Sequence, residues 1–129
     1  MSVHIHRAGP IGDIAHRPGM RGRDLIGTEH GVTSLFVSDL FMDHGSSIPL
    51  HTHPTEEIFF VVEGELVMKI GDETVVADAE SVVRIPARTP HAIRNDGSDT
   101  AHAFTAGAWN RATWFKDGTT YLEGIPRTD

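Results

Sequence analysis

Short apolar runs separated by turn residues at regular intervals constrain the fold of this chain more than any other feature. From residue 32 onward, runs rich in valine, isoleucine, leucine and phenylalanine are followed by glycine, proline, asparagine or aspartate. This pattern is typical of β-strands joined by tight turns, and it leaves little room for helices. We expect seven strands, at residues 32–42, 55–62, 66–70, 74–77, 81–85, 91–94 and 100–108. Such a series indicates an all-β protein, built as an antiparallel sandwich or barrel.

The regions on either side of these strands differ in character. Residues 1–31 are rich in glycine, proline and arginine and show no sustained period, so we expect an irregular N-terminal arm that packs on the barrel or on a partner. Residues 109–129 include Trp114, Phe115 and Tyr121 and are too apolar for a free tail, so we expect a C-terminal cap. A chain of 129 residues can bury one proper core, which predicts a single domain with its barrel at 32–108.

The composition argues against several kinds of site and partner. The chain has no cysteine, so it offers neither a thiolate nucleophile nor a sulfur ligand for a metal. It carries 18 acidic and 11 basic residues, and the resulting net charge of -7 makes nucleic acid a poor partner. The start of the chain lacks the layout of a secretory signal, and no apolar stretch approaches the length of a bilayer span. We therefore expect no membrane partner and a cytoplasmic location.

Two histidines and a glutamate stand close together at residues 51, 53 and 57. Side chains two, four and six residues apart share one face of an extended strand, so all three are expected on one side of a single strand. The apolar run that follows, 58–62, places them in the core, where unpaired polar groups are costly. Joined by His91 from another strand, they make a four-ligand site for a divalent metal. The alternative is a hydrogen-bonded network of the same side chains. Surface positions are expected for His4, His6, His16, His30 and His44.

The spacing of these residues resembles that of the cupin superfamily. Every position of the first cupin motif is present, in the order Gly45, five residues, His51-Thr52-His53, three residues, Glu57, six residues and Gly64. The second motif keeps its proline, histidine and asparagine as Pro86, His91 and Asn95. Its two glycines are replaced by Glu80 and Arg88. The replacements concern the shape of the local turns and leave the candidate ligand in place.

The resemblance implies a compact single-barrel protein built like a jelly roll, and it covers most of the chain. It also implies one divalent transition metal per subunit, namely iron, manganese, nickel or zinc, held by His51, His53, Glu57 and His91. Members of the superfamily include dioxygenases, isomerases, lyases, decarboxylases, polyketide cyclases and proteins that only bind a ligand. The fold by itself therefore does not give the function.

We predict a metal-dependent enzyme that acts on a small, oxygenated molecule. The wall beside the ligands is expected to include Phe59, Val61, Ile93 and either Phe104 with Ala106 or Ala103 with Thr105. Because this wall is mostly apolar, it favours a hydrophobic or aromatic substrate. The reaction that we expect first is oxidative cleavage of the substrate by O₂, and Glu57 is expected to be one of the catalytic residues. Non-redox cyclisation or isomerisation is the close alternative, and a binding protein without catalysis is the alternative of a different class.

Several charged or titratable residues lie near the predicted ligands. His102 is a candidate general base if it faces the cavity, and the alternative is an exterior imidazole. Glu56 points away from the metal in the expected register, so we assign it to an external or interface position. Arg84 and Arg94 are expected on an outer face or in ion pairs with carboxylates.

The remaining prediction concerns assembly. The aromatic C-terminal segment and the Gly/Pro-rich arm add apolar surface, and a single chain of 129 residues is too small to bury all of it. We therefore expect a homodimer that uses outer-face strand residues such as Phe60 and Val62.

Overall fold

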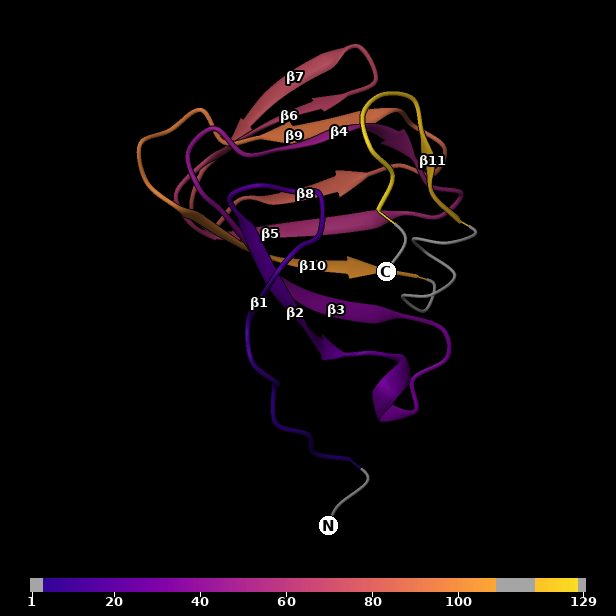
Figure 1. The fold of residues 1–129 in the computed structure, drawn as a ribbon. Coiled ribbons are helices and arrows are strands. Elements are labelled where there is room, and N and C mark those ends of the chain that lie inside the picture. The colour runs from indigo at the N-terminus through magenta and orange to yellow at the C-terminus, as the bar shows by residue number, and fades with distance from the viewer. Residues whose placement is uncertain (1–3, 109–117, 128–129) are drawn as a thin grey trace.

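Two antiparallel β-sheets packed face to face form the computed structural model, which describes residues 4–108 and 118–127 (Figure 1). The first sheet consists, in spatial order, of β1 (Gly12–Asp13), β2 (Met20–Ile26), β3 (Phe36–Met42), β10 (Ala101–Gly107), β5 (Glu57–Glu63) and β8 (Val82–Ile85). The second consists of β11 (Thr120–Tyr121), β4 (Ser47–Thr52), β9 (His91–Arg94), β6 (Leu66–Ile70) and β7 (Glu73–Ala77). A 3-10 helix, η1 (Thr28–His30), lies between β2 and β3. The expected all-β jelly roll is confirmed. Within the described ranges, no helix has the length and apolar character needed to span a bilayer.

Alternating side chains along the strands build the core between the two sheets. In β5, Phe59 and Val61 are buried whereas Phe60 between them is exposed. From the opposite sheet, Met68 of β6 and Ile93 of β9 belong to the same buried cluster. Burial of a side chain of this size stabilises the fold by about 1.5 to 3 kcal/mol. The core therefore holds the two sheets together along the length of the barrel.

The N-terminal arm is more regular than we expected. Residues 20–26 form β2, which pairs with β3 from Met20 opposite Met42 to Ile26 opposite Val37, so the expectation of an irregular segment was wrong there. The strand has no apolar alternation, because its sequence is Met-Arg-Gly-Arg-Asp-Leu-Ile. A Cβ atom on Gly22 would lie only 2.7 Å from the Asp39 carbonyl oxygen, so the close approach of the two strands requires glycine there.

β4 also lies outside the strands that we predicted. It contains Pro49, which has no N–H for a sheet hydrogen bond, and its pairing with β9 shifts in register between Ile48 and His51. Such a strand gives a weak sequence signal. Two predicted strands also begin at least two residues later than expected, since β3 starts at Phe36 and β5 starts at Glu57.

Two residues other than glycine adopt the left-handed backbone conformation at the positions where the second cupin motif has glycines. These are Glu80, with a φ of 71°, and Arg88, with a φ of 62°. The conformation costs an L-residue about 1 to 2 kcal/mol. The amide of Glu80 donates to the Val61 carbonyl at 2.8 Å, and the amide of Arg88 donates to the His53 carbonyl at 2.6 Å. The turns therefore keep the shape that glycine would allow, held by bonds to neighbouring segments.

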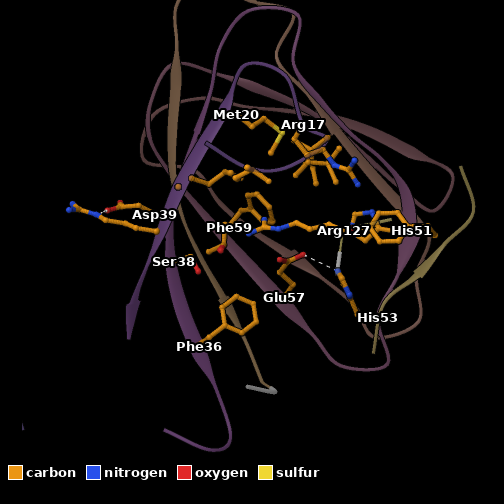
Figure 2. Close-up of a pocket in the computed structure, with 18 residues that line it drawn as sticks. Arg17, Met20, Phe36, Ser38, Asp39, His51, His53, Glu57, Phe59 and Arg127 are labelled. Atoms are coloured by element: carbon orange, nitrogen blue, oxygen red, sulfur yellow. Dashed lines mark hydrogen bonds and ion pairs between the residues drawn. The ribbon is translucent and has the colours of Figure 1, made fainter. Parts of the chain in front are cut away.

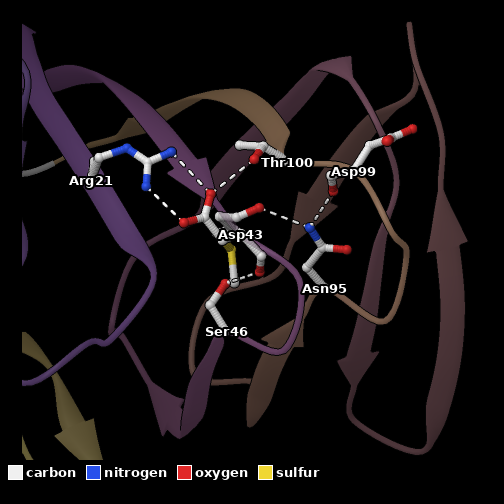
Figure 3. Close-up of polar contacts among 7 residues, drawn as sticks. Arg21, Asp43, Ser46, Asn95, Asp99 and Thr100 are labelled. Carbon is white, nitrogen blue, oxygen red and sulfur yellow. Dashed lines mark hydrogen bonds and ion pairs between the residues drawn. The ribbon is translucent and has the colours of Figure 1, made fainter.

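At one end of the sandwich, the buried side chain of Asn95 joins the loop between β9 and β10 to the end of β3 (Figure 3). Its Nδ2 donates to the carbonyl oxygens of Met42 at 2.7 Å and Asp99 at 2.9 Å. Its Oδ1 accepts a hydrogen bond from the amide of Gly97 at 2.9 Å. Asn95 directly follows β9, and its amide donates to the carbonyl of Ser46, which directly precedes β4. We call this region the Asn95 end.

Asp43 forms the second part of the Asn95 end. Its two carboxylate oxygens accept hydrogen bonds from the Arg21 guanidinium at 2.8 and 3.0 Å, and Thr100 donates a third at 2.8 Å. The bonds from Arg21 and then from Thr100 lower the pKa of Asp43 to about 2. Arg21 belongs to β2, so this carboxylate fastens the N-terminal strand to the end of β3 (Figure 3).

Candidate metal centre

Four chelating side chains meet at the end of the sandwich opposite Asn95. His51 lies near the end of β4, His91 begins β9, Glu57 begins β5, and His53 lies in the loop between β4 and β5. One ligand atom from each residue can be chosen so that all four lie within 4.8 Å of one another. We call these residues the His/Glu cluster. The expectation that His51, His53 and Glu57 share one strand was wrong, because β4 ends at Thr52 and the turn after it brings Glu57 back to the two histidines (Figure 2).

The imidazole rings of the cluster are oriented through their Nδ1 atoms. His51 Nδ1 donates to the Pro49 carbonyl at 2.6 Å, and His91 Nδ1 donates to the Thr89 carbonyl at 2.8 Å. Because a carbonyl oxygen only accepts, Nδ1 carries a proton in both rings, and in the neutral form of either ring Nε2 keeps its lone pair. His53 Nδ1 lies 2.9 Å from the Thr119 hydroxyl. Contacts of this kind orient histidines that bind metals.

Burial dominates the electrostatics of the cluster. Burial and then the charge of His91 lower the pKa of His51 to about 3. Burial and then the charge of His51 lower the pKa of His53 to about 2. Burial raises the pKa of the Glu57 carboxyl, and the neighbouring His91 acts in the opposite direction. His51 and His53 are therefore neutral near pH 7, and the Nε2 lone pair of His51 is available to a cation.

The donor set of the cluster fits a divalent metal better than it fits a closed hydrogen-bond network. His91 Nε2 is buried and has no hydrogen-bond partner among residues 4–108 and 118–127. It lies 3.4 Å from Glu57 Oε1, and His53 Nε2 lies 3.6 Å from the same oxygen. A network built for stability would satisfy this nitrogen, since buried polar groups nearly always have partners. Three imidazoles and one carboxylate suit a divalent transition metal, so the cluster could hold a metal ion.

The cluster opens into a cavity between the two sheets. Of the expected lining residues, Phe59, Ile93 and Thr105 line it, whereas Val61 is buried in the core beyond it. Phe104 is exposed on the outer face, so β10 presents the alternative with Ala103 and Thr105 turned inward. The other apolar lining residues are Ile14, Met20, Phe36, Leu40 and Ile48. The expected apolar wall is therefore present, but polar and charged residues, including Ser38 and Asp39, also line the cavity.

His102 lies on the outer face of the first sheet, because the odd-numbered residues of β10 point inward. Its Nε2 lies 2.6 Å from Asp39 Oδ1, and its ring stacks on that of Phe41 with 4.2 Å between the centroids. It is not among the described residues that line the cavity. The suggestion of a general base in the cavity is therefore corrected to the alternative, an exterior imidazole.

The charged residues near the cluster follow the expected arrangement. Glu56 forms a surface ion pair with Arg84, so it points away from its neighbour Glu57. Arg94 donates through Nε to Asp96 Oδ2 at 2.8 Å, also at the surface. Neither arginine lines the cavity.

Three other arginines, Arg17, Arg23 and Arg127, are among the residues that line the cavity, and we did not anticipate them. The side chain of Arg23 pairs with Asp39, whereas Figure 2 labels Arg17 and Arg127. Arg17 comes from the loop between β1 and β2 and is 5% exposed. Its guanidinium carbon lies 5.5 Å from the ring centroid of Tyr121, and that ring stacks on His51 with 5.3 Å between centroids. Arg17 Nη2 donates to the carbonyl of Ile125, 108 residues later in the chain. No local pattern around Arg17 signals such a position.

Two curated relatives are named as polyketide synthase proteins. The chain is 38% identical over 72 residues to polyketide synthase CurC of Streptomyces cyaneus, which covers 55% of this chain and 47% of that protein. It is 28% identical over 86 residues to the tetracenomycin polyketide synthase protein TcmJ of Streptomyces glaucescens, covering 65% and 58%. The chain spans about half the length of the curated relatives it matches.

Solved structures show the same fold. The polyketide cyclase RemF from Streptomyces resistomycificus has a TM-score of 0.74 at 18% identity, with 99% of this chain and 87% of that chain covered. An RmlC-like cupin from Shewanella frigidimarina has a TM-score of 0.69 at 19% identity, with 81% and 87% covered. The Cupin domain profile matches residues 40–107, which include the whole His/Glu cluster and more than half of the chain. The chain therefore belongs to the cupin family.

Proposed function

We propose that this cupin is a metal-dependent enzyme that acts on a small, oxygenated molecule in the cavity between its sheets. In this proposal His51, His53, Glu57 and His91 hold one divalent metal. The observation that carries it is the buried Nε2 of His91, which lacks a hydrogen-bond partner among the described residues and faces three other ligand atoms. Perturbed titratable groups beside a cavity are typical of functional sites.

The reaction class that we favour is non-redox cyclisation of a substrate with several carbonyl groups. Two relatives carry polyketide synthase names, and a structural neighbour is named as a polyketide cyclase. Such a cyclisation joins an acidic methylene carbon to a carbonyl carbon of the same molecule and then loses water, so it needs no oxidant. A mostly apolar cavity suits the hydrocarbon body of such a substrate.

Residues of the chain itself supply the other roles in this reaction, namely binding the substrate, excluding water and orienting the histidines. A divalent metal, when bound, would supply Lewis acidity toward a carbonyl oxygen of the substrate. Phe59 and Ile93 form apolar wall next to the cluster and exclude water from it. The Thr105 hydroxyl offers a hydrogen bond within the same wall. Pro49 and Thr89 hold the rings of His51 and His91 in position through their carbonyl oxygens.

We infer from the size of the cavity that its wall has to move for a substrate to bind. Its volume is about 50 Å³, which is room for only a few water molecules. Tyr121 and Arg127 form the part of the wall contributed by the C-terminal segment. Beyond its two-residue strand β11, this segment is attached by a few hydrogen bonds, from the amides of Leu122 and Glu123 to the Leu50 carbonyl, at 2.9 and 3.2 Å, and from Arg17 Nη2 to the Ile125 carbonyl, at 2.6 Å. We therefore place the opening at this segment.

Metal analysis combined with an assay under nitrogen tests the proposal. Protein purified without an affinity tag should contain about one divalent metal per chain, and it should convert a linear aromatic polyketide precursor equally well in nitrogen and in air. His53→Ala should lose metal and turnover together, because three remaining ligands hold a dication weakly. The matched control is His44→Ala, an exposed histidine outside the cluster, which should change neither. A folded, active wild-type protein without metal would refute the proposal.

Oxidative cleavage by O₂ is the second candidate, because a nitrogen and oxygen donor set without thiolate suits iron(II) as well as zinc. O₂ uptake in proportion to substrate consumed, with no turnover under nitrogen, would favour it over cyclisation. Tight binding of a small molecule without turnover in either gas would favour a binding protein.

We also propose a homodimer formed through the outer face of the first sheet. Phe60 and Phe104 are cross-strand neighbours and each is 37% exposed. Val82, opposite Phe60 on β8, is 62% exposed. A contiguous apolar row on a sheet surface is typical of an interface, and Val62 extends the same face. Light scattering should give about twice the chain mass of 14.1 kDa, and Phe60→Lys should halve it. A wild-type mass equal to one chain would refute the dimer.

A further inference from the structure

Arg17 brings a buried positive charge into the cavity that contains the His/Glu cluster. Its side chain lines the cavity together with His51 (Figure 2), and its guanidinium lies against the ring of Tyr121. Its terminal nitrogens donate to two carbonyl oxygens, Nη1 to His16 at 2.9 Å and Nη2 to Ile125 at 2.6 Å. These bonds use two of the five N–H donors of a guanidinium and neutralise none of its charge.

The environment of Arg17 differs from that of the arginines that form ion pairs. Arg21, Arg23, Arg84 and Arg94 each pair with a carboxylate, and their side chains are all at least 30% exposed. Arg17 is more deeply buried, yet in the part of the chain that the structure describes no carboxylate pairs with it. The chain has 18 acidic residues, so carboxylates are not scarce. Buried charges are normally paired, because an unpaired one is costly to remove from water.

We propose that Arg17 binds a carboxylate of the substrate, so that the cavity selects an acidic molecule whose other oxygenated end reaches the His/Glu cluster. This rests on the proposed function in taking the cavity as the substrate site. The planar guanidinium matches a carboxylate with two parallel hydrogen bonds. The Tyr121 ring fixes the direction, since it contacts the Arg17 guanidinium and also stacks on His51. Arg17 is thus a residue that determines substrate specificity.

A purely structural role for Arg17 makes a different prediction. Through Ile125 it fastens the C-terminal segment of the second sheet to the β1–β2 loop of the first. If that were its whole role, loss of the guanidinium would loosen the cavity wall and weaken charged and neutral ligands alike. Charge selection would stay the same. The ratio of affinities for two ligands of equal shape therefore separates the two roles.

Benzoate and benzamide provide that pair, because they share a planar apolar ring and differ in charge. Their dissociation constants are to be measured by calorimetry or NMR titration on the metal-loaded full chain. Wild-type protein should bind benzoate about tenfold tighter than benzamide or better. Arg17→Gln keeps a donor for the Ile125 carbonyl but removes the charge, so it should lose most of that preference while benzamide affinity stays within about twofold. Arg17→Lys should keep an intermediate preference.

Arg84→Gln is the matched control, because it removes one positive charge at the surface and away from the cavity. It should retain the wild-type preference. Equal affinities of wild-type protein for the two ligands would overturn the proposal without any variant, and so would an Arg17→Gln protein with unchanged preference. Metal content per chain, measured on the same samples, reports on the proposed function separately. If metal is missing but the charge preference depends on Arg17, then the proposed function fails and the carboxylate site stands.

Discussion

Strands β4 and β9 have a buried polar cluster at each of their two ends, and the two clusters differ in how their hydrogen bonds are satisfied. At the Asn95 end, both amide hydrogens and the amide oxygen of Asn95 have backbone partners between 2.7 and 2.9 Å away. At the His/Glu cluster, the Nδ1 atoms of His51 and His91 are satisfied by backbone carbonyls. The Nε2 of His91, however, has no hydrogen-bond partner among the described residues, although Glu57 Oε1 lies 3.4 Å away.

The difference shows how one pair of strands can serve two purposes. Buried polar groups that are fully bonded rigidify a fold and specify its loops. Groups that are bonded on one side only are oriented but remain able to bind something else, at a cost in stability. We infer that the Asn95 end stabilises the barrel, whereas the His/Glu cluster lowers the stability of the metal-free chain in exchange for a binding site.

The largest expected effect is at the Asn95 end. Asn95→Ala leaves the carbonyls of Met42 and Asp99 and the amide of Gly97 without their partner, so the free energy of unfolding should fall by about 3 kcal/mol. Urea denaturation of metal-free protein measures it. Asp96→Ala, at the exposed neighbouring position, should change the value by less than about 0.5 kcal/mol. A small effect of Asn95→Ala would remove the contrast between the two ends.

Glu57→Gln is the corresponding change in the His/Glu cluster. The amide keeps the shape of the side chain but removes a buried negative charge, so metal affinity should fall by about tenfold or more. In the metal-free chain the free energy of unfolding should stay the same or rise, because burial already disfavours the charged carboxylate. Metal competition and urea denaturation measure the two quantities. If the variant keeps wild-type metal affinity, Glu57 is not a ligand.

The ion pair of Asp43 should make the Asn95 end sensitive to acid. Its folded pKa of about 2 lies below the ordinary value of 3.8, so the folded state favours the charged form. The stability that this provides is complete above pH 3.8 and is lost as the pH falls through about 2. Asp43→Asn should therefore be less stable than wild type at neutral pH, and the difference should shrink below pH 3.8. A difference that is constant with pH would show that the charge of Asp43 plays no part.

The smallest expected effects come from the two left-handed turns, one near each end. Glu80→Gly and Arg88→Gly each relieve backbone strain of about 1 to 2 kcal/mol and also add freedom to the unfolded chain, which offsets about 0.4 to 1 kcal/mol of it. Each variant should gain about 1 kcal/mol or less in the free energy of unfolding. Metal content should not change, because glycine keeps the amide that Arg88 donates to His53. A loss of metal in Arg88→Gly alone would show that its side chain supports the cluster.

The strands and the four cluster residues could be predicted because both depend on short-range patterns. Alternation over a few residues located β6 and the flanking turn residues located β9 at their observed bounds, and the motif spacing identified His51, His53, Glu57 and His91. The same alternation could not decide which face of β10 is inside, since a period of two fits either face. That is why His102 was a candidate for the cavity.

Other features depend on contacts between distant parts of the chain, which no local pattern reveals. β2 is a strand because β3 lies beside it and Gly22 permits the approach, although its own residues alternate poorly. Arg17 is buried because the segment around Ile125 folds over it. Burial of a charged residue is the exception to the usual rule, so it is the kind of feature that sequence alone predicts least well.

The family profile matches residues 40–107. Arg17, Tyr121 and Arg127 lie outside this range, although all three line the cavity that contains the His/Glu cluster. Substitutions in the two flanks can therefore change the cavity wall without changing any residue of the His/Glu cluster. Paralogues with near-identical barrels would then accept different molecules. Exchange of residues 1–39 and 108–129 between two such proteins should transfer ligand preference and leave metal binding with the barrel.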